Sequence, residues 1–200
     1  MRAALLLLAA LALSACVTRP PAAPSAALPY EQRRAGLQSL STFGLEARVA
    51  AAVGSEGFNV SLAWTQQGER STLDLRAPLG FGAAHVVNDA QGLQVEAGQG
   101  QRYAGASARD ELTRRLGFEP PLQSLRYWLL GVPDPASAAA ETLSVDGLSL
   151  LAIEQGGWQI QISDYARYGN TALGASLPRR LSLQRDGVRV KLVIDQWTLP

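Results

Sequence analysis

Alternation of apolar and polar side chains is the feature that most constrains the fold. In FNVSLAWTQ, Phe58, Val60, Leu62 and Trp64 share one face, and polar or small residues share the other. A repeat of two residues is typical of a β-strand with one buried face. The alternation recurs in residues 45–53, 73–76, 93–97, 158–163, 181–183 and 188–194. Turn sequences such as QQGE, NDAQG and RDG separate these segments, so we expect one large antiparallel sheet with a single apolar face.

An apolar sheet face must be covered, and helical segments are available to cover it. Residues 30–40, 107–117 and 121–131 have helical spacing, with Ser107 expected as a cap and Pro121 in a first turn. The apolar stripe of the last helix consists of Leu122, Leu125, Trp128 and Leu129. We predict a mainly β protein with helices (α+β), a strongly curved, unclosed antiparallel β-barrel or half-barrel whose concave side is plugged by helices around an apolar cavity. Periodicity leaves open how completely the helices fill that side.

The N-terminal residues predict export and a lipid anchor. MRAALLLLAALALSAC has one positive charge, and its apolar run is shorter than the roughly 20 residues of a membrane-spanning helix. We therefore interpret residues 1–15 as a signal peptide. LSAC is similar to a bacterial lipobox, which predicts lipidation of Cys16, the only cysteine. The alternative is an ordinary signal peptide cut near Ala15, with Cys16 incidental.

The segment after Cys16 predicts a tether and a location. Residues 16–29 are rich in Pro and Ala and connect the anchor to a single domain over residues 30–200. Two or more acyl chains hold a protein stably on a membrane, so we expect attachment without a membrane span. In bacterial lipoproteins, an aspartate after the lipidated cysteine commonly means retention at the inner membrane. Val17 stands there instead, which favours the periplasmic face of the outer membrane.

Composition argues against catalysis and against nucleic-acid binding. Removing Arg2 with the leader leaves 17 of the 18 basic residues against 17 acidic ones, so the basic surface of a nucleic-acid binder is missing. His85 is the single histidine, Lys191 is the single lysine, and no phosphate-binding loop of the type GxxxxGKS or GxxxxGKT occurs. We interpret His85 as an ordinary strand residue. The carboxylates are scattered, so we expect a binding protein with no catalytic residues, metal or cofactor.

The turn after residues 73–76 contains apolar side chains where turns usually have polar ones. In APLGFG, Pro78 ends the strand, and Leu79 and Phe81 lie in the turn. APLG is compatible with a type I turn, which lets Leu79 point outward without backbone strain. We predict a tip that touches lipid, formed by Pro78, Leu79, Gly80 and Phe81. The alternative is that Leu79 folds back onto the sheet.

Five segments between about Leu37 and the C-terminus carry a resemblance to a known family. They are AWTQQG, APLG, LGFEPPLQSLRYWLLGVP, GGWQIQISDY and VKLVIDQW. The pattern PLxSLRxWxxGxP, from Pro121 to Pro133, is the most specific. In these segments and their order, the chain resembles the LolB family of outer-membrane lipoprotein receptors.

The resemblance implies a function, partners and site residues. A receptor of this kind takes lipoproteins from the periplasmic carrier LolA, holds their acyl chains in an apolar cavity and inserts them into the outer membrane without nucleotide hydrolysis. It is not an enzyme. The family's protruding leucine, linked to membrane insertion, matches Leu79. We expect a monomer whose partners are the carrier, the cargo and the bilayer. The candidate cavity residues, taken from the strand faces and the helix stripe, are Val49, Val60, Leu62, Trp64, Leu73, Leu75, Leu125, Trp128 and Leu129.

Other functions remain open at this point. A LolA-like carrier, or another periplasmic lipid-binding lipoprotein, would share the fold, although a lipidated Cys16 argues against a protein that shuttles. A structural outer-membrane assembly lipoprotein would have a fully packed core. A periplasmic hydrolase would need a cluster of polar residues that the sequence does not show.

Overall fold

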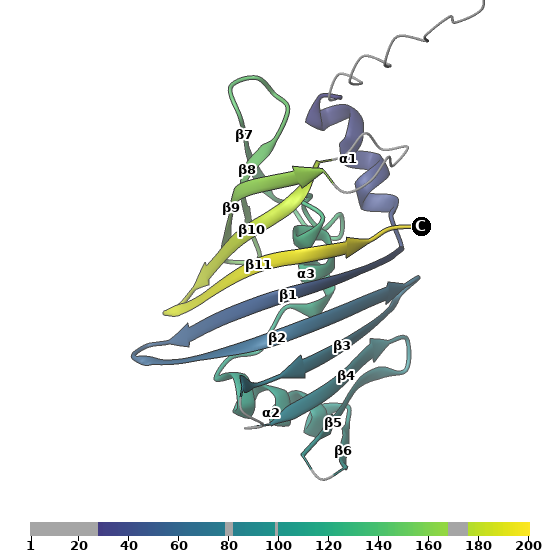
Figure 1. Ribbon diagram of the computed structural model, residues 1–200, viewed down its shortest axis with the longest axis vertical. Coiled ribbons are helices and arrows are strands. Elements are labelled where there is room, and N and C mark those ends of the chain that lie inside the picture. The colour runs from purple at the N-terminus through teal and green to yellow at the C-terminus, as the bar shows by residue number, and fades with distance from the viewer. Residues whose placement is uncertain (1–27, 79–81, 99, 168–175) are drawn as a thin grey trace, which may run out of the picture.

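The computed structural model describes residues 28–78, 82–98, 100–167 and 176–200, and Figure 1 shows one broad, curved sheet. Its eleven strands have the order β6-β5-β4-β3-β2-β1-β11-β10-β9-β8-β7. The first strands along the chain are β1 (Thr42–Val53), β2 (Glu56–Gln67), β3 (Arg70–Arg76), β4 (Ala83–Asp89), β5 (Gly92–Ala97) and β6 (Gln101–Ala104). The later strands are β7 (Ala140–Leu143), β8 (Leu150–Gln155), β9 (Trp158–Arg167), β10 (Ser176–Arg185) and β11 (Val188–Thr198).

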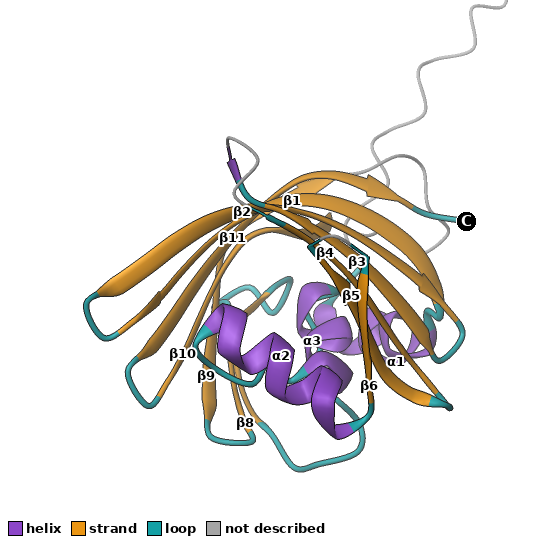
Figure 2. Cartoon of the chain, turned by 90° about the horizontal axis from the view of Figure 1, so that it is seen from below, coloured by secondary structure: helices purple, strands orange, loops and turns teal. Residues whose placement is uncertain are grey.

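The sheet forms an arch that does not close on itself. Figure 2 shows this arch over the helices α2 (Ala106–Leu116) and α3 (Leu122–Leu129). In the described part of the chain, its two edges are β6 and β7, of four residues each. All neighbouring strands are antiparallel, and β1 pairs with both β2 and β11, which joins the two halves of the chain in the middle of the arch. The predicted curved, unclosed antiparallel sheet with helices inside is confirmed.

Alternation along the strands becomes burial on one face of the sheet. On β9, Trp158, Ile160 and Ile162 are buried, while Gln159 and Gln161 are exposed. Side chains of a strand point to opposite faces in turn, so the apolar set faces the concave side and the polar set faces solvent.

The helix starts differ in detail from the sequence predictions. Gly105, with φ 58°, precedes α2, and Ser107 lies within the first turn. Its hydroxyl donates to the carbonyl oxygen of Ala104 (2.9 Å) and does not cap the helix. The predicted Ser107 cap is therefore wrong, because the backbone turns into the helix at the glycine. Pro121 immediately precedes α3 and does not lie in its first turn.

The first helix, α1 (Tyr30–Ser39), is fixed at one end of the arch by a buried arginine. Arg33 is 5% exposed and donates to the carbonyl oxygens of Leu148 (2.6 Å) and Ser176 (3.3 Å). The hydroxyl of Tyr30 donates to a carboxylate oxygen of Glu141, and burial, followed by this hydrogen bond, raises the pKa of the tyrosine. The helix that follows the predicted tether is thus joined to the sheet by charged and polar contacts as well as by apolar ones.

The C-terminal half of α3 is part of a densely filled region of the core. We call it the packed region and define it by Trp128, Leu129, Val132, Asp134 and Gln155. The amide oxygen of Gln155 accepts hydrogen bonds from Trp128 Nε1 (2.8 Å) and from the backbone N–H of Asp134 (2.9 Å). The amide nitrogen of Gln155 donates to the carbonyl oxygen of Asp134 (2.7 Å). Gln155 is only 3% exposed, so this side chain ties the end of α3 to β8 through satisfied buried groups.

Gly131 lets the chain turn sharply after α3. Its φ is 75°, and a Cβ at this position would lie 3.0 Å from the ring of Pro178 and 3.3 Å from the hydroxyl oxygen of Tyr165. Both the positive backbone angle and the lack of room for a side chain favour glycine here.

The predicted signal peptide, Cys16 and all but the last two residues of the tether lie outside the described residues. Within the described part of the chain, no helix has the length and the apolar character needed to cross a membrane.

Candidate functional site: an apolar cavity

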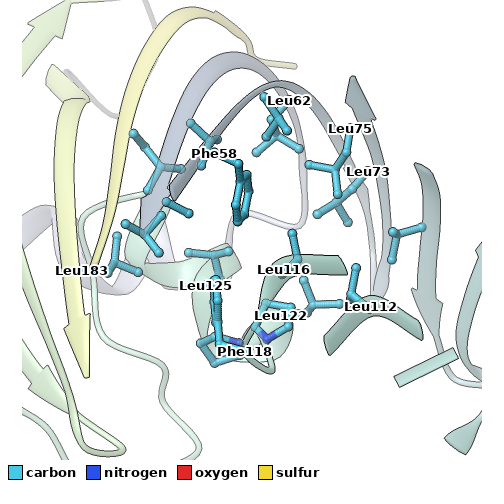
Figure 3. A pocket seen from close by; sticks show the side chains of 18 of the residues that line it. Phe58, Leu62, Leu73, Leu75, Leu112, Leu116, Phe118, Leu122, Leu125 and Leu183 are labelled. Carbon is cyan, nitrogen blue, oxygen red and sulfur yellow. The ribbon is translucent and has the colours of Figure 1, made fainter. Parts of the chain in front are cut away.

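An apolar cavity lies between the arch and the helices α2 and α3 (Figure 3). Phe58 points into its middle, with Leu62, Leu73 and Leu75 on the sheet side and Leu125 on the helix side. The full lining consists of Val49, Ala51, Phe58, Val60, Leu62, Leu73, Leu75, Val86, Leu112, Leu116, Phe118, Pro120, Pro121, Leu122, Leu125, Trp158, Leu183, Val190 and Leu192.

The cavity is narrow and apolar. The space between its lining atoms is about 690 Å³ when the part open to solvent is included, and the centres of water-sized molecules can occupy about 80 Å³ of it. The centre of a single water molecule needs only about 10–15 Å³, so the cavity is a genuine void. Its lining side chains are aliphatic or aromatic, and voids of this kind stay dry and take up apolar molecules.

Most of the predicted cavity residues meet at this void. Val49, Val60, Leu62, Leu73, Leu75 and Leu125 line it. Contact of these side chains with acyl chains stays a prediction.

The other three candidates, Trp64, Trp128 and Leu129, are not part of the lining. They are 1%, 1% and 0% exposed, and Trp64 Nε1 donates to the amide oxygen of Gln66 (3.2 Å). Alternation and helix spacing predict which face of a strand or helix a residue lies on, but they do not predict whether a void or other side chains lie opposite that face. These three residues were therefore wrongly placed in the cavity wall.

Other lining residues were not among the cavity residues predicted from the sequence. Phe58 continues the alternation of Val60 and Leu62, so the same pattern could have included it. Phe118 comes from the segment between α2 and α3, and Trp158 is the first residue of β9. Trp158 continues the alternation of Ile160 and Ile162, so the same pattern could have included it as well, whereas no periodic signal marks Phe118.

The cavity opens toward the loop between β3 and β4. A second hollow, of about 640 Å³ including its solvent-exposed part, shares Phe58 and Leu75 with the cavity and continues to Ala77 and Gly82. The backbone N–H of Ala77 donates to the carbonyl oxygen of Gly82 (2.9 Å), which closes the base of the loop. Pro78 is exposed at this base. The rest of the predicted lipid-touching tip, residues 79–81, lies outside the described residues.

On α2, two arginines bond to a carboxylate that is itself buried. Glu111 accepts hydrogen bonds from Arg114 Nη2 (2.7 Å) and Arg115 Nε (2.6 Å), and these bonds lower the pKa of the carboxyl. On the inner face of the same helix, Leu112 and Leu116 line the cavity. The helix therefore separates an ionic surface from an apolar interior.

The lining offers no group for acid–base or nucleophilic catalysis, because none of its side chains has a carboxylate, imidazole, hydroxyl, thiol or amine. His85 Nδ1 lies 2.8 Å from Asp74 Oδ1, and both side chains are nearly half exposed on the face of the sheet away from the cavity. Among the residues that the structure describes, no group of three or more His, Cys, Asp or Glu side chains could hold a metal ion.

Comparison with known proteins identifies the family. The family model described as "Outer membrane lipoprotein LolB" matches residues 41–197. The outer-membrane lipoprotein LolB of Nitrosococcus oceani is 32% identical over 201 residues, which cover 99% of this chain and 98% of that protein. The chain belongs to the LolB family. The LolB of Thiobacillus denitrificans is 35% identical over 187 residues, covering 93% of this chain and 91% of its own. As a LolB-family member, the protein is an outer-membrane lipoprotein.

Solved structures share the LolB fold seen here. A DUF1329 family protein from Desulfovibrio piger has a TM-score of 0.54 at 10% identity, covering 84% of this chain and 89% of its own. A LolA superfamily protein from Nitrosomonas europaea has a TM-score of 0.53 at 9% identity, covering 87% and 94%. At these identities the likeness shows the fold alone.

The most specific LolB-like segment, Pro121 to Pro133, has two roles in the structure. Leu122 and Leu125 line the cavity, whereas Trp128 belongs to the packed region. The segment thus builds one wall of the LolB cavity and fixes it to β8.

Proposed function

We propose that the protein accepts lipoproteins from a LolA-type periplasmic carrier, holds their acyl chains in the apolar cavity and releases them into the outer membrane. The observation that carries this proposal is the cavity lining, which is aliphatic or aromatic throughout and opens to solvent beside the β3–β4 loop. Membership of the LolB family supports a role in lipoprotein localisation. A structural lipoprotein with a fully packed core would have no such void.

Transfer needs no nucleotide if each step runs downhill. Each methylene buried from water contributes roughly 0.8 kcal/mol, so acyl chains leave one apolar site only for another that binds them at least as well. A narrow cavity holds chains less completely than a bilayer does. The affinity for the acyl chains therefore rises from the carrier to the receptor and from the receptor to the membrane. The receptor never needs to hold its cargo tightly.

The β3–β4 loop is the proposed point of contact with the bilayer. Ala77 and Gly82 at its base border the hollow that continues the cavity, so acyl chains that leave this way emerge at the base of the loop whose sequence contains Leu79 and Phe81. Burying one leucine contributes roughly 1.5–3 kcal/mol, which biases the loop toward lipid without holding the protein there. The covalent anchor at Cys16 provides the permanent attachment, and a protein anchored in this way acts as a receptor and not as a shuttle.

A transfer assay tests the proposal. The carrier is loaded with a radiolabelled lipoprotein and incubated with the full chain carrying Cys16→Ser, which prevents acylation, and liposomes are then added without nucleotide. We expect the label to move to the receptor and then to the liposomes. Label that stays on the carrier at every receptor concentration would contradict the proposal.

The loop is tested in the same assay with Leu79→Glu. This variant is expected to accept cargo normally and to deliver it to liposomes at least tenfold more slowly, because a carboxylate opposes insertion into the bilayer. Val145→Glu is the matched control, since Val145 is an exposed apolar residue between β7 and β8, away from the cavity lining. Equal delivery by both variants would remove the loop from the mechanism.

A further inference from the structure

The four tryptophans of the chain differ in how their indole N–H groups are bonded. Trp64 Nε1 donates to Gln66 Oε1 (3.2 Å), and Trp128 Nε1 donates to Gln155 Oε1 (2.8 Å). Trp197 Nε1 donates to the carbonyl oxygen of Pro178 (3.2 Å). Trp158 Nε1 is buried and has no hydrogen-bond partner within the described part of the chain. The indole without a partner is also the one that lines the cavity.

The ring of Trp158 lies at the border between the apolar cavity and a polar hollow beside Arg185. Phe118, another lining residue, lies 6.1 Å away between ring centroids, and Trp128 of the packed region lies 6.3 Å away. The guanidinium of Arg185 lies 4.7 Å from the ring centroid. Arg185 also borders a separate open hollow at the turns before β9 and before β11, lined mainly by polar residues and glycines. The Trp158 ring therefore contacts apolar rings of the interior and a cation that borders the open hollow.

An unpaired buried N–H is costly in a folded protein. Leaving such a donor without an acceptor costs about 1–3 kcal/mol, and most buried donors in native structures are paired. The pairing of Trp64, Trp128 and Trp197 shows that this chain provides acceptors for buried indoles elsewhere. The exception lies at the proposed ligand site, so the missing acceptor is best supplied by the ligand.

We propose that the Trp158 N–H donates a hydrogen bond to the ester carbonyl of an acyl chain held in the cavity. This inference rests on the proposed function. An indole N–H is a donor only, and an ester carbonyl is an acceptor only, so the two groups match without leaving a further polar group unpaired. The amide nitrogen and hydroxyl groups of a headgroup would bring donors that the apolar lining cannot satisfy.

The position of Trp158 fixes the orientation of the acyl chain in the cavity. The hydrocarbon extends from the ester into the cavity, and the polar group beyond the ester points to the open hollow beside Arg185. Trp158 is 2% exposed, and its nitrogen is shielded from solvent. The hydrogen bond therefore forms as the entering acyl chain displaces the atoms that cover the nitrogen, and the site selects ester-linked chains over plain hydrocarbon.

The test compares two non-ionic lipids that differ only in the carbonyl, monopalmitoylglycerol and hexadecylglycerol ether. Both are titrated below their aggregation limits into the full chain carrying Cys16→Ser, labelled with nitrogen-15 in its indoles. We expect the ester to bind about 5–10-fold more tightly, as one added hydrogen bond allows. The Trp158 indole proton resonance should move downfield with the ester and stay in place with the ether.

Replacing Trp158 with benzothienylalanine removes the N–H and keeps the two-ring shape. The preference for the ester should disappear, and stability should not fall, because no protein partner is lost. The same replacement at Trp128 is the matched control. It should lower stability, since Gln155 loses its donor, and leave the ester preference unchanged.

The outcomes separate the two proposals. Equal binding of ester and ether, with an unmoved Trp158 resonance, would overturn the ester site and leave the cavity function intact. Binding of neither lipid would overturn the cavity function, and the ester site with it. If the Trp158 replacement fails to fold, Trp158→Phe, which also lacks the N–H, is measured with the same lipid pair, and a retained ester preference would overturn the inference.

Discussion

The two halves of α3 face different surroundings. Leu122 and Leu125 line the cavity, whereas Trp128 and Leu129, one turn later, are buried in the packed region. In the packed region Gln155 links an indole and two backbone groups by hydrogen bonds. In the cavity, among the described residues, the only polar atom of a lining side chain is an indole nitrogen.

The difference lies in how strictly each region specifies its neighbours. A buried hydrogen bond has a preferred length and direction, so the packed region is satisfied by one arrangement. Apolar contacts have no direction, so side chains in the cavity can exchange one hydrocarbon neighbour for another at little cost. Under the proposed function, the packed region would therefore keep the fold unchanged while the cavity fills and empties.

Gln155→Leu should have the largest effect on the packed region. It leaves the N–H groups of Trp128 and Asp134 without their acceptor, which should lower the free energy of unfolding by about 3–5 kcal/mol. Urea unfolding followed by tryptophan fluorescence measures this. Gln161→Leu on the exposed face of β9 is the control, with an expected change within about 0.5 kcal/mol. Similar losses for both variants would mean that the buried network does not hold α3.

Truncation of two leucines of α3 compares the stability cost of lost side-chain volume in the packed region and in the cavity wall. Leu129→Ala should cost about 3 kcal/mol, because the residue is fully buried among fixed neighbours. Leu125→Ala should cost about 1–2 kcal/mol, because Leu125 is partly exposed and already borders a void. Unfolding in urea measures both. Equal costs would show that the cavity wall is packed as tightly as the rest of the core.

Enlarging a valine in each region should affect two different quantities. In the packed region it should lower stability, and in the cavity it should weaken lipid binding. Val132→Phe should cost about 1–3 kcal/mol, since Val132 is completely buried and an added ring must displace its neighbours. Val60→Phe places the ring in the cavity, so stability should change by less than about 1 kcal/mol while hexadecylglycerol ether binds about tenfold more weakly. Calorimetry with that lipid, together with thermal unfolding, measures both quantities. Unchanged binding by Val60→Phe would place the acyl chain elsewhere.

The ion pairs of α2 should have the smallest effect. Hydrogen bonds from Arg114 and Arg115 lower the pKa of Glu111 below its ordinary value of 4.5, so the ionised carboxylate stabilises the fold above that pH. The contribution is lost as the pH falls through the lowered pKa. Glu111→Gln keeps an oxygen acceptor for the two arginines, so it should lower Tm by only roughly 1–2 °C at neutral pH, and it should match the unchanged protein in strong acid. Melting curves from about pH 3 to pH 7 that stay parallel for the two proteins would contradict this.

Much of the fold could be predicted because alternation follows directly from strand geometry. Residues 58–65 and 188–194 alternate regularly, and both lie in long central strands. The strand β8 was missed because its buried residues, Leu150, Ile153 and Gln155, do not follow a repeat of two. A register shift between β7 and β8, at Thr142 and Leu143, accompanies this irregular burial.

The cavity could be predicted only in part. The stripe Leu122, Leu125, Trp128 and Leu129 is continuous in sequence, yet the structure divides it between a void and a packed core. That division depends on Gln155, a polar residue some 26 positions further along the chain than Leu129, and no local pattern connects the two. Likewise, nothing in the sequence around Trp158 shows that its N–H lacks an acceptor.

In the part of the chain that the structure describes, the sheet has two unpaired edge strands, which give the interior a property that a closed barrel does not have. The radius of a closed barrel is set by its strand number and stagger, so its volume is a constant of the fold. Here β6 and β7 end the arch, and α2 contacts β5 and β6, so that edge and its helix can move outward together with every strand pairing kept. Volume then becomes an adjustable quantity, and under the proposed function this would let acyl chains of different number and length share one site.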